Sequence, residues 1–299
     1  MKKRWVFRED HQPERAEKLA VELNVANELS SLLCARNADS FAKARQFFRP
    51  AFDQLHDPFL MNDMLLAVER IKSAIKMDEK ILIYGDYDVD GTTAVSVVYS
   101  FIKSIYERVQ YYIPDRYLEG YGISTIGIDW AKEQGITLII ALDCGIKSIE
   151  HIQYASSILI DFIIADHHVP GATLPAAIAV LDPKREDSTY PFKELSGCGI
   201  GYKLVTALVT HLKLATLPTG LYLDMVAISI AADVVEVCDE NRILAYYGLK
   251  QLNEKPCSGL KALIKSAGLN SEITFNEVLF QLGPRINAAG RMKKATLVV

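Results

Sequence analysis

The 299-residue chain lacks the features that mark several broad classes of protein. No apolar run approaches the roughly 18 residues of a membrane-spanning helix. The basic start reaches charged residues after three apolar ones, too few for a signal peptide. The five cysteines are scattered, odd in number and without Cys-x-x-Cys spacing, which argues against a disulfide framework. We therefore expect a soluble chain with free thiols in a reducing compartment, the cytoplasm, and no membrane partner.

An excess of basic charge is also missing. The formal net charge is −4 and the isoelectric point is about 5.9, so no global positive field indicates nucleic acid. This balance does not exclude nucleic acid, because aspartates that bind cations add negative charge that the cations cancel. The sequence contains neither a Walker loop nor a Gly-x-Ser-x-Gly stretch, so NTP-driven work and a serine nucleophile are not predicted.

Half of the residues are hydrophobic, enough for the core of one large domain or two smaller ones. Between residues 62 and 181, β-rich apolar runs alternate with helical patterns. We expect helices at 62–76, 92–105, 124–134 and 147–156, and strands at 80–84, 109–113, 137–142, 162–165 and 177–181. The alternation predicts an α/β fold with a mostly parallel sheet and helices on both of its faces.

Helical patterns dominate at both ends of the chain. Residues 1–55 are expected to form an N-terminal helical segment, with short helices between 12 and 48. The α/β domain is expected over 56–240 and a helical segment over 241–299, with helices at 200–213, 220–232 and 241–253 around this boundary. The apolar last residues carry no cap or polar tail, so we expect a further domain to follow.

Three aspartates, Asp86, Asp88 and Asp90, follow the predicted strand 80–84 at every second position and are closed by Gly91. Alternate residues of an extended segment project to one side, so the three carboxylates are expected to converge. Converging carboxylates repel unless a multivalent cation or raised pKa values relieve the charge. Turn hydrogen bonds or helix capping are the alternative for one or two of them. A calcium loop is excluded, because Val97 stands where its twelfth-position glutamate would be.

Two further predicted strands end in acidic or imidazole side chains. Asp143 follows 137–142, and Asp166, His167 and His168 follow 162–165. Ligands collect at the carboxyl ends of parallel strands, and imidazole is a common metal ligand. Asp233 is a further candidate, because it interrupts an apolar helical stretch where a buried carboxylate needs a partner. A partner arginine would satisfy it equally well.

The ordered set Asp86-x-Asp88-x-Asp90-Gly91, Asp143-Cys144-Gly145, Asp166-His167-His168 and Asp233 resembles the four motifs of the DHH phosphoesterases. Residues 113–122, 196–203 and 282–291 resemble the RecJ branch of that family, so the resemblance covers about 80–292. It implies a DHH catalytic domain over 56–240. It also implies that 241–299 connects this domain to a second lobe and an OB-fold that this sequence does not contain.

The same resemblance implies a site with two divalent cations, Mn²⁺ or Mg²⁺, bound by Asp88, Asp90, Asp143, His167 and Asp233. Asp143 would bridge the two ions, and four carboxylates would balance their charge. Asp86 would be an accessory ligand or orient a water molecule. His168 would contact the scissile phosphate, and Asp166 would hold a histidine ring from behind.

Arg116 lies past a predicted strand end, in a loop rich in glycine and tyrosine. Its guanidinium is suited to bind a terminal phosphate with two hydrogen bonds, and the RecJ resemblance implies a 5′ phosphate. An exposed ion pair with Glu119 is the alternative. Arg285, Asn287 and Arg291 form a polar cluster suited to backbone phosphates, with helix capping and interdomain pairing as alternatives.

As a whole, the resemblance implies a two-metal-dependent exonuclease that hydrolyses single-stranded DNA from 5′ to 3′ in DNA repair and recombination. A single-strand-binding protein and a helicase are the implied partners. One alternative is a DHH phosphodiesterase acting on short oligonucleotides or cyclic dinucleotides. Another is a nucleic-acid-binding relative without activity, against which the retention of every expected ligand type argues.

Overall fold

The computed structural model describes residues 4, 6, 13–214, 220–292, 296, 298 and 299. The chain divides into two compact units, Met1–Leu55 and His56–Val299. The first unit contains the helices expected between 12 and 48: α1 (Pro13–Leu23), α2 (Asn27–Cys34) and α3 (Phe41–Phe48), then a 3-10 turn, Phe52–Gln54. A small apolar core holds it together, made of Leu19, Leu33, Ala38 and Ala44.

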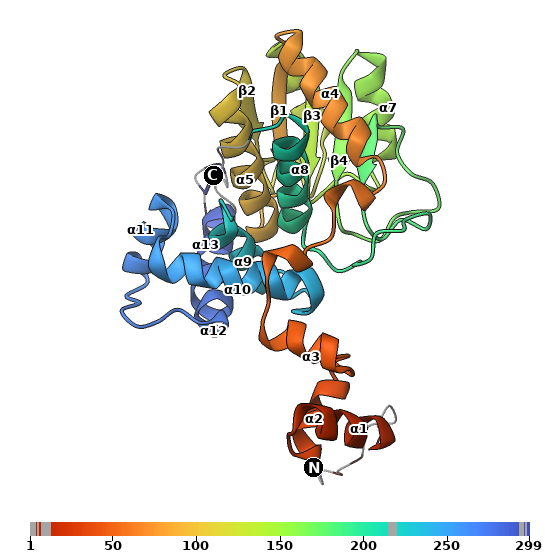
Figure 1. Cartoon of the computed structure of the whole chain (residues 1–299). Helices are drawn as coiled ribbons and strands as arrows, with labels where there is room; N and C mark the ends of the chain where they lie inside the picture. Colours follow the sequence, from red (N-terminus) through yellow and green to blue (C-terminus); the bar gives the residue numbers. More distant parts are fainter. Residues whose placement is uncertain (1–3, 5, 7–12, 215–219, 293–295, 297) are drawn as a thin grey trace. The chain divides into compact units, whose positions relative to one another are not determined.

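The second unit is built on a five-stranded sheet. Its strands are β1 (Lys80–Gly85), β2 (Val109–Tyr112), β3 (Ile136–Leu142), β4 (Asp161–Ala165) and β5 (Ala179–Leu181). They lie in the order β2-β1-β3-β4-β5, and every neighbouring pair is parallel (Figure 1). The predicted α/β fold with a parallel sheet is confirmed.

Helices cover both faces of this sheet, as predicted. One face packs against α6 (Thr125–Glu133) and α7 (Ile149–Ser157), through strand residues such as Leu82, Ile139 and Phe162. The other face is covered by α4 (Met64–Lys76), α5 (Val89–Ile105) and α8 (Gly197–His211). Burial of both faces explains why the strands read as continuous apolar runs rather than as alternating ones.

A group of helices follows α8 along the chain. It comprises α9 (Leu223–Ala232), α10 (Asp239–Glu254), α11 (Ser258–Ser266), α12 (Phe275–Glu277), a π-helical turn (Val278–Leu282) and α13 (Gly283–Met292). These helices share an apolar cluster that includes Ile228, Leu252, Leu260 and Leu282. Val89, in the first turn of α5, belongs to the same cluster, so this group is anchored beside the start of α5.

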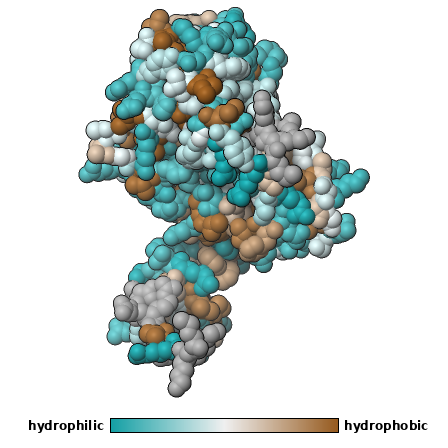
Figure 2. Space-filling model, turned by 180° about the vertical axis from the view of Figure 1, so that it is seen from behind, coloured by the Kyte–Doolittle hydropathy of each residue, from teal (hydrophilic) through white to brown (hydrophobic). Residues whose placement is uncertain are grey.

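The surface of this unit is mainly hydrophilic in the view of Figure 2, with apolar side chains scattered between polar ones. None of the helices in the described part of the chain has both the length and the apolar character needed to cross a membrane.

Several predicted helix starts differ from the structure, among them those of α8 and α9, and the start of α5 changes the local picture of the aspartate run. Helix α5 begins at Val89 rather than Thr92, so Asp90 lies in its first turn and Asp88 is its N-cap residue. The three aspartates therefore do not lie on one extended segment. Helix α4 begins at Met64 and not at residue 62, and the side-chain amide of Asn62 donates to Asp187.

Candidate active site

Four neighbouring strands each end in a buried aspartate at the same level of the sheet: Asp86, Asp143, Asp166 and Asp182. Their last residues are paired in register: Gly85 with Leu142, Leu142 with Ala165, and Ala165 with Leu181. Buried carboxylates are costly unless they are hydrogen-bonded, protonated or bound to a cation. The carboxyl edge of the sheet is therefore the place where chemistry is expected.

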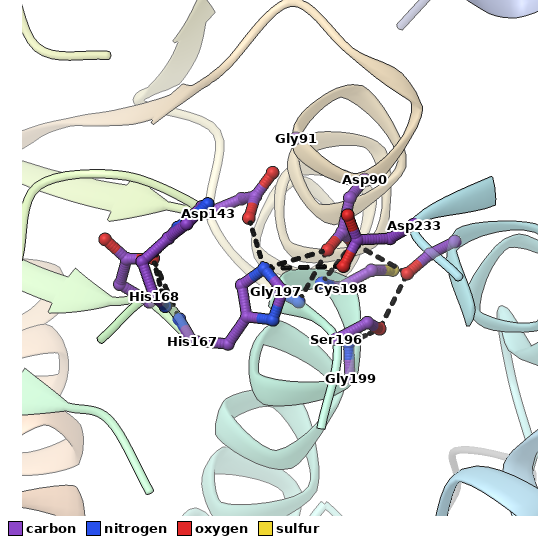
Figure 3. Close-up of polar contacts among 12 residues, drawn as sticks. Asp90, Gly91, Asp143, His167, His168, Ser196, Gly197, Cys198, Gly199 and Asp233 are labelled. Atoms are coloured by element: carbon purple, nitrogen blue, oxygen red, sulfur yellow. Dashed lines mark hydrogen bonds and ion pairs between the residues drawn. The ribbon is translucent and has the colours of Figure 1, made fainter. Parts of the chain in front are cut away.

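His167 lies at the centre of this edge and faces three carboxylates (Figure 3). Its Nε2 atom is 3.2 Å from Oδ1 of Asp143, 3.6 Å from Oδ2 of Asp233 and 3.7 Å from Oδ2 of Asp90. Within the described residues, neither ring nitrogen of His167 has a hydrogen-bond partner, and Oδ1 of Asp143 has none. Buried polar atoms without partners that face one another form a ligand set suited to a cation.

Two overlapping groups of side chains have ligand atoms within 4.8 Å of one another: Asp143, His167 and His168, and Asp90, His167 and Asp233. Four of the five predicted metal ligands are thus brought together. The fifth, Asp88, is outside both groups. Its Oδ1 atom accepts a hydrogen bond of 3.0 Å from the amide of Gly91, so its capping role, which was the alternative, is formed.

Asp90 is held by the amino end of α8. The amides of Gly197 and Cys198 donate to its two carboxylate oxygens over 2.7 and 2.8 Å, and the hydroxyl of Ser229 lies 2.6 Å from Oδ1. Free amides at a helix start carry partial positive charge and favour an anion there. Ser196 caps the same helix, because its hydroxyl accepts a hydrogen bond from Gly199. The first residues of the RecJ-like stretch 196–203 therefore fix the orientation of the Asp90 carboxylate.

The end of this stretch has a structural role. Lys203 is buried, forms an ion pair with Glu240 of α10 and donates to the carbonyl of His56 over 2.6 Å. Tyr190 donates to the same glutamate over 2.6 Å. Because a buried charge needs a partner, the Lys203–Glu240 pair fixes the position of α8 against α10.

Burial governs the protonation of the carboxylates at this edge. It raises the pKa of Asp143 well above its usual value, and the charges of Asp90 and Asp88 add to the effect. Burial and the charge of Asp88 likewise raise the pKa of Asp86 to about 7. Burial lowers the pKa of His167, which favours the neutral ring that binds metals. A divalent cation would relieve this crowding of negative charge, so the residues present fit a metal.

Both carboxylate oxygens of Asp166, one of the four strand-end aspartates, have hydrogen-bond partners. Its Oδ1 atom accepts from the amide of His167 over 2.8 Å and lies 2.7 Å from Nδ1 of His168, while Oδ2 accepts from Ile146. Burial opposes ionisation of Asp166, but these bonds outweigh it and lower its pKa. The hydrogen bond to Asp166 in turn raises the pKa of His168, which points its Nε2 atom toward the hydroxyl of Tyr121, 3.3 Å away.

The predicted environment of Asp233 is wrong. Its apolar neighbours predict burial, but α9 ends at Ala232, where the helix 220–232 was expected to end, and Asp233 is its exposed C-cap residue. Its carboxylate still reaches the Nε2 atom of His167, the atom that Asp143 also approaches (Figure 3). No arginine partner of Asp233 occurs among the described residues, so the alternative of an ion pair is not formed.

Asp86 lies apart from the two ligand groups. Its Oδ1 atom accepts a hydrogen bond of 3.3 Å from the amide of Gly122, and Oδ2 has no partner in the described part of the chain. Asp182, which was not a candidate, is in a similar state. Its Oδ1 atom accepts from the amide of Lys184 over 2.7 Å, Oδ2 is unpartnered, and burial raises its pKa to about 7. Its place directly after a predicted strand was the signal that could have identified it.

The loop after β2 presents Arg116 to solvent. The predicted alternative, an ion pair with Glu119, is not formed, because Glu119 accepts hydrogen bonds from the amide of Asp115 and the hydroxyls of Tyr112 and Ser124. These bonds close the loop into a compact turn. The guanidinium carbon of Arg116 lies 5.0 Å from the ring centre of Tyr87, and its charge has no carboxylate partner within the described ranges.

The polar cluster on α13 approaches this loop. The hydroxyl of Tyr117 donates to the carbonyl of Arg291 over 3.1 Å. Arg285 is exposed and donates to the carbonyl of Gln281 in the preceding π-helical turn, and Asn287, two residues after Arg285, is partly buried. The contact between Tyr117 and Arg291 brings the two RecJ-like stretches, 113–122 and 282–291, together.

Residues 80–230 match the model of the DHH family, N-terminal domain. The chain belongs to the DHH family. It is 42% identical over 295 residues to the single-stranded-DNA-specific exonuclease RecJ of Bacillus subtilis, covering 98% of this chain and 37% of that protein. It is 36% identical over 238 residues to RecJ of Escherichia coli, covering 76% and 41%. The chain thus spans about two fifths of the length of these relatives.

Solved structures agree with this assignment. A crystal structure of exonuclease RecJ bound to manganese matches with a TM-score of 0.71 and 28% identity, covering 80% of this chain and 60% of that one. RecJ of Thermus thermophilus in complex with Mn²⁺ matches with a TM-score of 0.77 and 24% identity, covering 95% and 40%, which shows the fold alone. The predicted resemblance to the DHH phosphoesterases, and within them to RecJ, is confirmed.

Proposed function

We propose that this chain is the catalytic part of a metal-dependent exonuclease that hydrolyses single-stranded DNA from its 5′ end, in DNA repair and recombination. The observation that carries the proposal is the group of buried, unpartnered ligand atoms around His167, in a chain similar to proteins named as single-stranded-DNA-specific exonucleases. Residues 56–240 are the proposed catalytic domain, and 241–299 the proposed connection to a second lobe.

Asp90, Asp143, His167 and Asp233 are the residues that would hold two divalent cations, with Asp143 between them and Asp88 as a further ligand. Mn²⁺ and Mg²⁺ are the proposed ions, because carboxylates with a single imidazole suit them and RecJ structures carry both. When bound, such cations promote deprotonation of water and neutralise charge on the phosphate oxygens.

The chain's own side chains would complete the reaction. Asp86, with its free Oδ2 atom, is placed to accept a proton from the attacking water or to orient it. His168, whose pKa the hydrogen bond to Asp166 raises, would donate in its protonated form to a non-bridging oxygen of the scissile phosphate. The water oxygen would form a bond to phosphorus, the bond from phosphorus to the 3′ oxygen of the terminal nucleotide would break, and that oxygen would take a proton from solvent and leave as a 3′-hydroxyl.

Recognition of the substrate is proposed at two places. Arg116, free of carboxylates and supported by Tyr87, would bind the terminal 5′ phosphate and so set the direction of hydrolysis. Arg285, Asn287 and Arg291 on the neighbouring α13 would contact backbone phosphates. A single-strand-binding protein and a helicase are proposed partners, and the cytoplasm is the proposed location.

Hydrolysis of defined substrates tests the proposal. The chain with Mn²⁺ or Mg²⁺ should release mononucleotides from 5′-phosphorylated single strands, but not from duplex DNA. Asp143→Ala should abolish the activity, whereas the exposed Asp129→Asn on α6 should leave it intact. Selective hydrolysis of dinucleotides or cyclic dinucleotides would replace the proposal by the DHH phosphodiesterase alternative. Binding of single strands without turnover would favour a non-catalytic relative.

A further inference from the structure

Lys184 lies beside the candidate site. It follows β5, the edge strand on the opposite side of the sheet from β2 and the Arg116 loop. Leu181, the last residue of β5, is paired with Ala165, the last residue of β4, and Lys184 follows three residues later. Its amide donates to Oδ1 of the buried Asp182 over 2.7 Å, which fixes the turn at the level of the row of strand-end aspartates.

The ammonium group of Lys184 can exchange its present carboxylate partner for another anion. Nζ lies 3.3 Å from Oε2 of Glu194, and the side chains are 22% and 41% exposed. Exposed ion pairs of this kind are weak, because water screens both charges. Lys184 can therefore release Glu194 in favour of a phosphate without leaving a buried charge unpaired.

Lys184 lies at the strand end next to the ligand group. Asp166, after β4, accepts hydrogen bonds from the amides of His167 and His168, and Asp182, after the neighbouring β5, accepts one from the amide of Lys184. Lys184 is thus a cation on the strand end adjacent to the ligand group, although no sequence motif singles it out.

The position of Lys184 has a consequence for the path of a nucleic acid. Arg116 follows β2 and Lys184 follows β5, the two edge strands of the sheet, while the ligand group follows β1, β3 and β4 between them. Two divalent cations would balance four of the five aspartates Asp86, Asp88, Asp90, Asp143 and Asp233. A single strand of DNA that crosses the carboxyl ends of these strands then needs another positively charged side chain, on the 3′ side of the scissile bond.

We propose that Lys184 binds a backbone phosphate on the 3′ side of the scissile bond, exchanging Glu194 for that phosphate when single-stranded DNA binds. The proposal rests on the proposed function, because it places the 5′ end at Arg116. Lys184 is then a substrate-binding residue that acts on strands longer than a dinucleotide.

Steady-state kinetics with Lys184→Gln and Lys184→Arg test this role. Lys184→Gln should raise KM for 5′-phosphorylated oligonucleotides about tenfold with little change in kcat, since one charge-assisted hydrogen bond is lost. The increase should vanish for a 5′-phosphorylated dinucleotide, which has no further phosphate, and Lys184→Arg should restore most of the affinity. Lys103→Gln is the matched control, because Lys103 also forms an ion pair with a glutamate, Glu107, but lies at the far end of α5.

The salt dependence of binding gives a readout separate from turnover. For a single strand with a non-hydrolysable first linkage, Lys184→Gln should reduce the slope of log K against log salt by about 0.7, the value of one phosphate contact on a single strand. An unchanged slope, or an equal rise in KM for the dinucleotide, would overturn the role of Lys184 while leaving the nuclease proposal intact. Wild-type chain that neither binds nor hydrolyses single strands would overturn both.

Discussion

Replacing Gly197 by alanine should disturb the candidate site more than the fold. Gly197 begins α8, and a Cβ atom on it would lie 2.6 Å from Oδ1 and 2.8 Å from Cγ of Asp143. Non-bonded carbon atoms settle at about 3.5 Å or more, so Asp143 and the start of α8 must separate by roughly 0.7 Å. The cost of such overpacking is about 1–3 kcal/mol of folding free energy.

The functional cost should be larger, because the same movement displaces Asp143 and pulls the amide of Gly197 away from Asp90. A misplacement of about 1 Å at a reacting centre lowers the rate by about 10²-fold. We expect Gly197→Ala to lower the rate of hydrolysis by the same factor. Its Mn²⁺ affinity, measured by calorimetric titration, should fall in parallel.

Gly259→Ala is the matched control for this substitution. Gly259 lies in the first turn of α11, and a Cβ atom on it would meet nothing within 4 Å, so alanine there should stabilise the chain by about 0.4–1 kcal/mol. Its rate and Mn²⁺ affinity should match the wild type. Wild-type Mn²⁺ affinity and rate in Gly197→Ala would refute the reasoning that this glycine sets the position of Asp143.

Three further predictions concern recognition, pH and metal. Arg116→Ala should raise KM for 5′-phosphorylated strands about tenfold and leave 5′-hydroxyl strands nearly unchanged, since one charge-assisted contact is lost; equal effects on both substrates would contradict it. Asp166 raises the pKa of His168, so activity that needs the protonated ring is present at low pH and lost as pH rises through that pKa; Asp166→Asn should move this loss to lower pH in a rate profile. Mn²⁺ at 100 times its dissociation constant should stabilise the chain by about 2.7 kcal/mol in thermal unfolding, and this gain should fall sharply in Asp143→Ala.

The sheet and its functional edge were predictable because their signals are local. Parallel strands buried on both faces must be apolar throughout, and each such run ends where an aspartate begins, as at Asp86, Asp143 and Asp166. Polar residues directly after buried strands lie at one edge whatever the order of the strands. The order itself, and therefore the opposite placement of Arg116 and Lys184, has no local signal.

The partners of Asp90 could not be predicted for the same reason. Gly197, Cys198 and Ser229 are separated from it by 107, 108 and 139 residues, so only the packing of α8 and α9 against α5 brings them together. Ser229 in particular lies in an apolar helix, where nothing in its neighbourhood indicates a contact with a carboxylate. The exposure of Asp233 was mispredicted from its apolar neighbours, although the helix was correctly expected to end at Ala232, which makes Asp233 its C-cap residue.

The expectation that Asp86, Asp88 and Asp90 converge from one extended segment was wrong, and this has a consequence for the role of each. If the three were on one extended segment, they would be equivalent ligands with similar freedom. In the folded chain Asp86 ends a strand, Asp88 caps a helix and Asp90 is held by the amides of a second helix. Only Asp90 combines a fixed orientation with an oxygen facing His167, so its loss should weaken metal binding more than that of Asp86, whose free oxygen is better placed for proton transfer.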